Sequence, residues 1–184
     1  MPLRKEEARY TYADYLTWED GERRELIDGV AYAMSPDASF AHQSVSVALL
    51  TQLSNYLQDK PCKVFTAPFD VRLNAVADDD TVVQPDILVV CDTSKFDSKG
   101  IIGAPDLIVE ILSPSTEKHD RNTKFKLYQR HGVREYWIVD PSNETVSVNI
   151  LNSGKYVTHL HFKEEIVPVS VLHGCSLDLG KVFV

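Results

Sequence analysis

The sequence lacks the features that mark membrane and secreted proteins. None of its hydrophobic runs approaches the roughly 20 apolar residues that a helix needs to cross a bilayer. Residues 1–7 turn polar at once and contain no apolar core of a signal peptide. We therefore expect a protein that has no membrane segment and stays in the cytoplasm.

Cysteine is scarce, and its spacing excludes several kinds of site. The three cysteines, Cys62, Cys91 and Cys175, form no CxxC motif and no cluster with histidine. A structural zinc site is therefore not expected. Because the count is odd and a cytoplasmic protein is expected, we predict reduced, mostly buried thiols.

Basic residues are outnumbered, with 19 Lys and Arg against 27 Asp and Glu and a net charge of −8. This balance argues against a large basic face for nucleic acid. It leaves room for a local basic strip, or for acidic residues gathered around metal ions.

The remaining composition is that of a soluble globular protein, with 43% hydrophobic and 25% charged residues. A chain of 184 residues fits one domain, which we predict to span residues 1–184. Helical and strand-like segments alternate along it, which favours an α/β (α+β) layered architecture.

Two helical signals and one hairpin are expected in the first third of the chain. Thr11 has the spacing of a cap for a short helix that ends near Trp18. Residues 24–34 are typical of a hairpin with its turn at Asp28-Gly29. Residues 39–57 predict a long helix with one apolar stripe, formed by Val45, Leu49, Leu53, Tyr56 and Leu57.

The rest of the chain predicts mainly strands, with one further helix. Residues 87–91 and 107–112 are apolar on both faces, as central strands covered on both sides should be. Residues 92–103 are expected to form a polar loop, and residues 118–130 a helix. The other expected strands are 63–66, 69–73 and 135–139, followed by an antiparallel extension at 146–151, 156–162 and 167–169.

Function is best sought where residues contradict the packing pattern around them. Glu110 is an acid inside an apolar strand, where a carboxylate must be paired, protonated or bound to a cation. Asp86 follows Pro85 at the start of a central strand, a place where α/β folds build sites. The ordinary alternatives are an outward-facing or Arg-paired Glu110 and a turn-capping Asp86.

Lys124 is the third such residue. At helical spacing it shares a face with Asp120, Leu127 and Tyr128, which is the face expected to turn toward the sheet. Lys118 and Lys126 point away from that face, toward solvent. The alternative is a Lys124 that lies along apolar surface or only pairs with Asp120.

Together, Asp86, Glu110 and Lys124 suit metal-assisted hydrolysis of a phosphodiester bond. Carboxylate oxygens suit Mg²⁺, with Mn²⁺ as a substitute, and a lysine orients water or stabilises developing charge. Glu25 is a further candidate carboxylate, or else a surface acid. His42 is a candidate ligand or proton carrier, although packing or a phosphate contact is favoured.

An ordered series of motifs resembles the Uma2 family of restriction-endonuclease-like proteins, in the PD-(D/E)xK nuclease superfamily. The resemblance runs from Tyr12 to about Cys175. Its motifs are Glu25-Leu26-Ile27-Asp28-Gly29, Gln84-Pro85-Asp86, residues 105–116 around Glu110, Asp120 with Lys124, Tyr128 and Gly132-Val133, and residues 135–141.

The resemblance implies a restriction-endonuclease-like fold, with a mixed central β-sheet flanked by helices and additional antiparallel strands. It also implies a divalent-metal site formed by Asp86, Glu110 and the main-chain carbonyl of Ile111. The lysine that the superfamily carries two residues after the acid is replaced by Leu112. Lys124 fits the alternative in which this lysine has migrated to the following helix, with Tyr128 as an accessory residue.

The main hypothesis is a Mg²⁺-dependent endonuclease that acts on DNA as a homodimer, in which two sites address two strands. One alternative is a catalytically inactive module that binds nucleic acid or a protein partner through the cleft or through residues 62–73. Another is a metal-dependent phosphoesterase acting on RNA or a nucleotide. Ser113 and Ser115 lack the GxSxG elbow of acyl-transfer nucleophiles.

Overall fold

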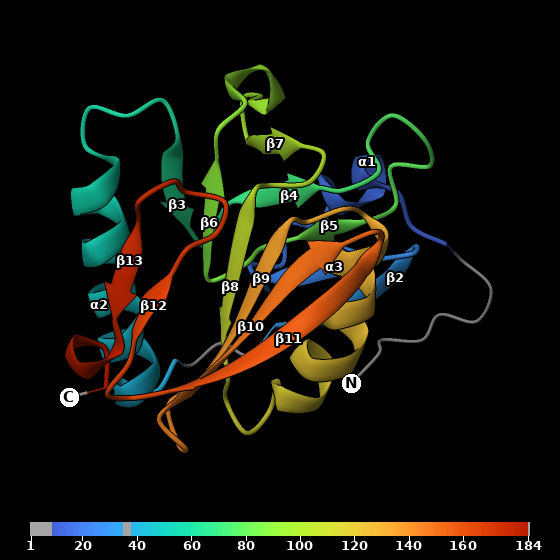
Figure 1. The fold of residues 1–184 in the computed structure, drawn as a ribbon. Helices are drawn as coiled ribbons and strands as arrows, with labels where there is room; N and C mark the ends of the chain where they lie inside the picture. The colour runs from blue at the N-terminus through green and yellow to red at the C-terminus, as the bar shows by residue number, and fades with distance from the viewer. Residues whose placement is uncertain (1–8, 35–37, 184) are drawn as a thin grey trace.

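A six-stranded sheet forms the centre of the computed structural model, which describes residues 9–34 and 38–183 (Figure 1). Strands β8 and β9 pair in parallel, and the other neighbouring pairs are antiparallel, so the sheet is mixed as predicted. The order β11-β10-β9-β8-β6-β3 corresponds to Lys155–Phe162, Thr145–Asn152, Glu135–Asp140, Leu107–Ile111, Ile87–Val90 and Lys63–Thr66.

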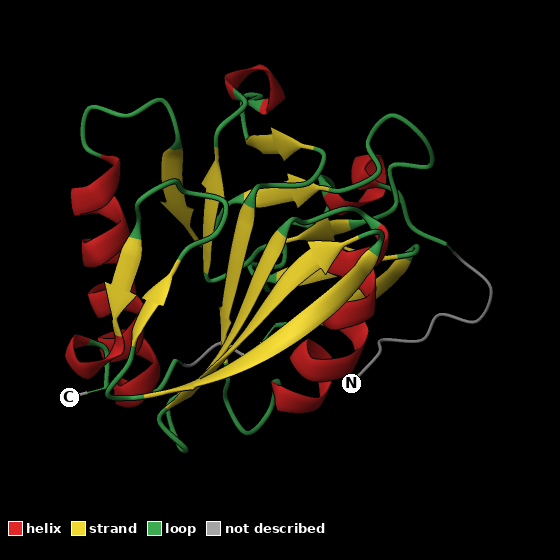
Figure 2. Ribbon diagram, viewed as in Figure 1, coloured by secondary structure: helices red, strands yellow, loops and turns green. Residues whose placement is uncertain are grey.

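Helices cover both faces of this sheet, as Figure 2 shows in red against the yellow strands. Helix α2 (Phe40–Leu57) lies on one face and begins at its N-cap, Ser39, as expected. The π-helix η2 (His119–Lys124) continues directly into α3 (Phe125–Arg130) on the other face. Among the described residues, no helix is both long and apolar enough to cross a membrane.

The two faces of β8 have different environments because side chains alternate along a strand. Leu107, Val109 and Ile111 pack in the core beneath α2. Ile108 packs in the second core, beneath α3, and Glu110 points to the same side. The strand therefore delivers one carboxylate to the face that η2 and α3 cover.

A second, five-stranded sheet packs against this face and shares the core beneath α3. Its order β2-β1-β5-β4-β7 corresponds to Val30–Ala33, Arg24–Ile27, Val82–Val83, Asp70–Arg72 and Gly100–Ile102. Strands β1 and β2 form the predicted hairpin, and Asp28 and Gly29 take the positive φ of 49° and 77° that its turn requires. Glu25 lies on the same face of β1 as the core residue Ile27.

The shorter elements confirm some expectations and correct others. Thr11 and Asp14 form a capping box on α1 (Tyr12–Tyr15), which ends before Trp18. The expected polar loop at 92–103 is wrong in part, because it contains the 3₁₀ turn η1 (Thr93–Lys95) and β7, which pairs in parallel with β4. In the C-terminal extension, β12 (Ile166–Pro168) matches the strand expected at 167–169, whereas β13 (Ser176–Asp178) and η3 (Leu179–Lys181) were not predicted.

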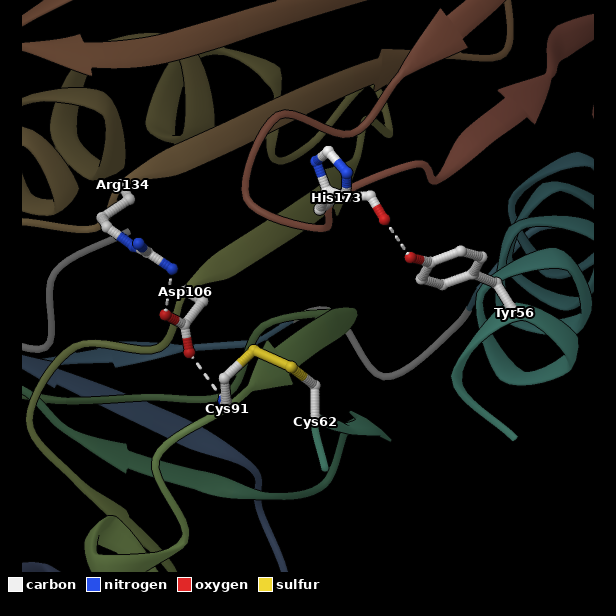
Figure 3. The surroundings of a disulfide bond; sticks show 6 residues. All are labelled: Tyr56, Cys62, Cys91, Asp106, Arg134 and His173. Atoms are coloured by element: carbon white, nitrogen blue, oxygen red, sulfur yellow. Dashed lines mark hydrogen bonds and ion pairs between the residues drawn. A yellow bond between two sulfur atoms is a disulfide. The ribbon is translucent and has the colours of Figure 1, made fainter. Parts of the chain in front are cut away.

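The prediction of reduced thiols is wrong for two of the three cysteines. Cys62 and Cys91 form a disulfide, because the antiparallel register that pairs Lys63 with Val90 brings them opposite each other. Figure 3 shows this disulfide beside Asp106, whose carboxylate accepts hydrogen bonds from the Cys91 backbone N–H and from the Arg134 side chain. Cys175 is free and buried, as expected.

This pairing predicts a thiol count. Denatured protein that has not been reduced should expose one thiol, that of Cys175, to a thiol reagent, and reduced protein should expose three. Because the bond joins residues 29 apart, a Cys62→Ser/Cys91→Ser variant should lose about 3–4 kcal/mol of unfolding free energy. Three reactive thiols in unreduced protein would contradict the pairing.

Candidate active site

A cavity of about 770 Å³ lies where the β1–β2 hairpin, α2, the end of β8 and η2 meet. Because β6 and β8 are antiparallel, the start of β6 and the end of β8 lie at the same end of the sheet. Asp86 precedes β6, and Glu110 and Ile111 end β8, so all three line the cavity. Glu25 and Lys124 line it too.

The ammonium group of Lys124 is the centre of a buried ionic network. Its Nζ lies 2.8 Å from Glu110 Oε1, 2.9 Å from Glu25 Oε1 and 3.7 Å from Asp120 Oδ1. The Lys124 side chain is only 5% exposed, and its three partners are equally buried. Three carboxylates from three separate elements therefore surround the three N–H donors of one ammonium group.

Asp120 and Lys124 enter the cavity together from one face of the π-helix η2. The backbone N–H of Phe125 donates to the carbonyl of Asp120, a step of five residues that widens the turn. In such a widened turn, residues four apart project in almost the same direction. Helix α3 then buries Leu127 and Tyr128, so the predicted inward face of this helix is confirmed.

Glu110 is desolvated, and its carboxylate has two polar partners. The Tyr128 hydroxyl donates a 2.7 Å hydrogen bond to the same Oε1 that Lys124 contacts. Burial raises the pKa of Glu110 strongly, Lys124 lowers it, and the charges of Asp120, Asp86 and Glu25 raise it further. The pKa of Glu110 therefore lies well above its ordinary value.

The pKa values of Asp120 and Lys124 are shifted by the same causes, burial and neighbouring charges. Burial raises the pKa of Asp120 to about 6, although the charge of Lys124 opposes this shift. Burial acts to lower the pKa of Lys124, but the carboxylates of Glu110, Glu25 and Asp120 outweigh it and hold that pKa well above its ordinary value. Lys124 is therefore cationic, while burial favours the neutral forms of the Glu110 and Asp120 carboxyl groups.

Asp86 is the most accessible carboxylate of the site, with 23% of its side chain exposed. Its Oδ2 accepts a 2.7 Å hydrogen bond from the backbone N–H of Ile111 and lies 3.3 Å from His42 Nε2. This contact raises the pKa of His42, burial opposes the rise, and the backbone of Ile111 adds to it. His42 therefore orients Asp86 and faces the end of β8.

The donor set suits a hard divalent cation. Asp86, Glu110 and the Ile111 carbonyl supply oxygen atoms at one end of two neighbouring strands, and burial, with the nearby carboxylates adding to it, raises the pKa values of Glu110 and Asp120. Within residues 9–34 and 38–183, no three His, Cys, Asp or Glu side chains form a ready-made metal cluster. Lys124 occupies the space between Glu25 and Glu110 instead.

Two residues of the site were not predicted. The backbone N–H of Gln84 donates a 2.9 Å hydrogen bond to Glu25 Oε1, and its side chain donates to Asp70, which fixes Glu25 from behind. His119 Nε2 lies 4.0 Å from Glu25 Oε2, and burial lowers the pKa of His119. The position of Gln84 in the Gln84-Pro85-Asp86 motif was the available signal.

The raised pKa of Asp120 predicts a pH-dependent stability. The pKa of Asp120 is about 6 in the folded state, against 3.8 ordinarily, so unfolding releases a proton between these two pH values. The unfolding free energy of the wild type therefore falls as pH rises from about 4 to 6, and it stays at the lower value above pH 6. Asp120→Asn should therefore raise the unfolding free energy of metal-free protein at pH 8 by about 1–3 kcal/mol and change it little at pH 4.

Denaturant melts at both pH values measure this difference. The exposed acid Asp59 provides the control, because asparagine tolerates its positive φ and Asp59→Asn should have no comparable effect. An Asp120→Asn variant that is less stable than wild type at pH 8 would contradict the raised pKa of Asp120.

Comparisons with known proteins agree with this architecture. Residues 12–180 match the model of the Uma2 family, described as "Putative restriction endonuclease". Two uncharacterized proteins of Synechocystis sp. are 34% and 30% identical over 140 and 135 residues; the alignments cover 74% and 71% of this chain and 70% and 74% of theirs.

A crystal structure titled as a "putative nuclease belonging to DUF820" from Anabaena variabilis superposes with a TM-score of 0.75. It is 22% identical, and the match covers 95% of this chain and 97% of that one. The predicted restriction-endonuclease-like fold is therefore confirmed.

Proposed function

Because the chain belongs to the Uma2 family of restriction-endonuclease-like proteins, we propose that it is a Mg²⁺-dependent endonuclease that hydrolyses phosphodiester bonds in DNA. The observation that carries this proposal is the buried contact of Lys124 with Glu110 and Glu25, beside Asp86 in one cavity. Mn²⁺ is a natural substitute, because it also accepts oxygen ligands.

Asp86, Glu110 and the Ile111 carbonyl would hold the cation. When bound, it supplies charge that neutralises the scissile phosphate and lowers the pKa of a coordinated water. The Ile111 N–H and His42 fix the Asp86 carboxylate, and Tyr128 fixes that of Glu110, so the oxygen donors are oriented before the substrate arrives.

Lys124 supplies a positive charge in contact with the buried carboxylates, where hydrolysis of a phosphodiester bond needs it. Its ammonium is held by Glu25 and Glu110 and remains protonated because of them. In this place it orients the attacking water or stabilises charge on the phosphate oxygens. Glu25 and Asp120 act as its positioning residues.

The inactive binding module is the alternative, and the net charge of −8 favours it. Burial of several charges in one cavity favours the enzyme, because each buried ion costs several kcal/mol in lost hydration and a purely binding surface has no need of them. We further propose a twofold homodimer, in which two such sites address the two strands of a duplex.

Metal binding gives the first test of this function. Because a ligand that binds the folded state alone stabilises it, Mg²⁺ or Mn²⁺ should raise the melting temperature of the wild-type protein. Asp86→Asn is nearly isosteric and should lose most of that shift, whereas the exposed-acid variant Glu164→Gln should retain it. Equal shifts in wild type and Asp86→Asn would place metal binding elsewhere.

Cleavage gives the second test, with supercoiled plasmid, single-stranded DNA and RNA in Mg²⁺, Mn²⁺ or EDTA. Lys124→Ala should reduce metal-dependent cleavage of DNA on the order of a hundredfold or more, because one transition-state contact is lost. Lys155→Ala, an exposed lysine on β11, should cleave like wild type.

Removing a buried cation can also destabilise the fold, so circular dichroism must show that Lys124→Ala is folded. If it is not, Asp86→Asn carries the same test, since its side chain is partly exposed. Folded Lys124→Ala that cleaves at the wild-type rate would refute the role of this lysine. A wild type that cleaves none of the substrates would favour the binding module.

A further inference from the structure

The outer side of the η2–α3 helix carries a line of polar and cationic side chains that the catalytic groups do not include. Lys118, Asn122 and Lys126 follow one another at intervals of four residues, and all three are exposed. Thr123 is half-buried beside them. These four residues, Lys118, Asn122, Thr123 and Lys126, are called the cationic strip below.

The cationic strip connects two cavities. Lys118 lines the active-site cavity, Lys126 lines a smaller cavity of about 280 Å³, and Asn122 and Thr123 line both. Lys118 and Lys126 lie about two helical turns apart, at the start of η2 and in the first turn of α3. A continuous surface therefore leads from the Glu110 carboxylate outward along this helix.

The two lysine amines of the strip have no carboxylate partner among residues 9–34 and 38–183. In contrast, Lys124 contacts Glu25 and Glu110, and Arg130 at the far end of the helix pairs with Asp28 at 2.7 Å. In a chain with a net charge of −8, unpaired amines along two joined cavities are available to an anionic ligand.

We propose that the cationic strip binds the sugar–phosphate backbone of a nucleic acid and leads it to the carboxylates; this inference rests on the proposed function. Two cations about two helical turns apart can each contact a phosphate of the same strand. The Asn122 amide donates one N–H to the Lys118 carbonyl at 3.0 Å, which leaves its second N–H for a phosphate oxygen. The Thr123 hydroxyl is a further donor to such an oxygen.

The strip also resolves the conflict between an acidic site and an anionic substrate. The carboxylates around Lys124 repel phosphate, so affinity for the backbone must come from cations outside that network. Contacts to phosphates position a strand without reading its bases. The strip therefore confers salt-dependent binding that does not depend on base sequence.

The test is binding of labelled single-stranded DNA, duplex DNA and RNA to the full chain in EDTA, over a range of salt concentrations. Lys118→Ala/Lys126→Ala should reduce the salt slope of log K by about 1.4 for a single strand or about 1.8 for a duplex, which is the loss of two phosphate contacts. The control Lys99→Ala/Lys155→Ala removes the same charge from exposed lysines outside both cavities and should keep the wild-type slope.

The nucleic acid for which the two double variants have different salt slopes is the one that binds along the cationic strip. If both double variants have the same salt slope for every nucleic acid and the wild type cleaves DNA, the proposed role of the cationic strip is wrong and the proposed function stands. A wild type that neither binds nor cleaves any of the three nucleic acids would overturn both.

Discussion

The contact of one buried ammonium group with carboxylates from separate elements is the constraint on which the rest of the structure depends. Lys124 comes from η2, Glu110 from β8 and Glu25 from β1, so the central sheet, the second sheet and the helix must meet at this point. Loss of Lys124 would leave its buried carboxylate partners without this cation, which costs several kcal/mol. The apolar cores on either side hold these elements in place.

The central part of this arrangement could be predicted from the sequence, because its residues contradict the pattern around them. Glu110 stands in an apolar strand, and Lys124 stands on the apolar face of a helix, so each required a partner. The two continuous apolar runs predicted β6 and β8 as central strands, and the resemblance to the Uma2 family implied that their sheet is mixed. The same reasoning placed Lys118 and Lys126 on the solvent side of that helix, where the structure has them.

Other parts could not be predicted, because they depend on pairing between distant segments. The β1–β2 hairpin was predicted, but its pairing with β5, β4 and β7 in a second sheet was not, because these strands of two or three residues are too short to show a periodic pattern. The Cys62–Cys91 bond follows from the register of β3 and β6, and no cysteine spacing encodes that register. The support of Glu25 by Gln84 runs through a backbone N–H, which leaves no trace in residue type.

Under the proposed function, this cavity holds a divalent cation between the ends of β6 and β8. A crystal structure of the protein soaked in Mn²⁺, with anomalous diffraction measured, tests that claim most directly. We expect an anomalous peak in contact with the Asp86 and Glu110 carboxylates and the Ile111 carbonyl. Mn²⁺ bound only outside this cavity, with the Lys124 contacts unchanged, would contradict it.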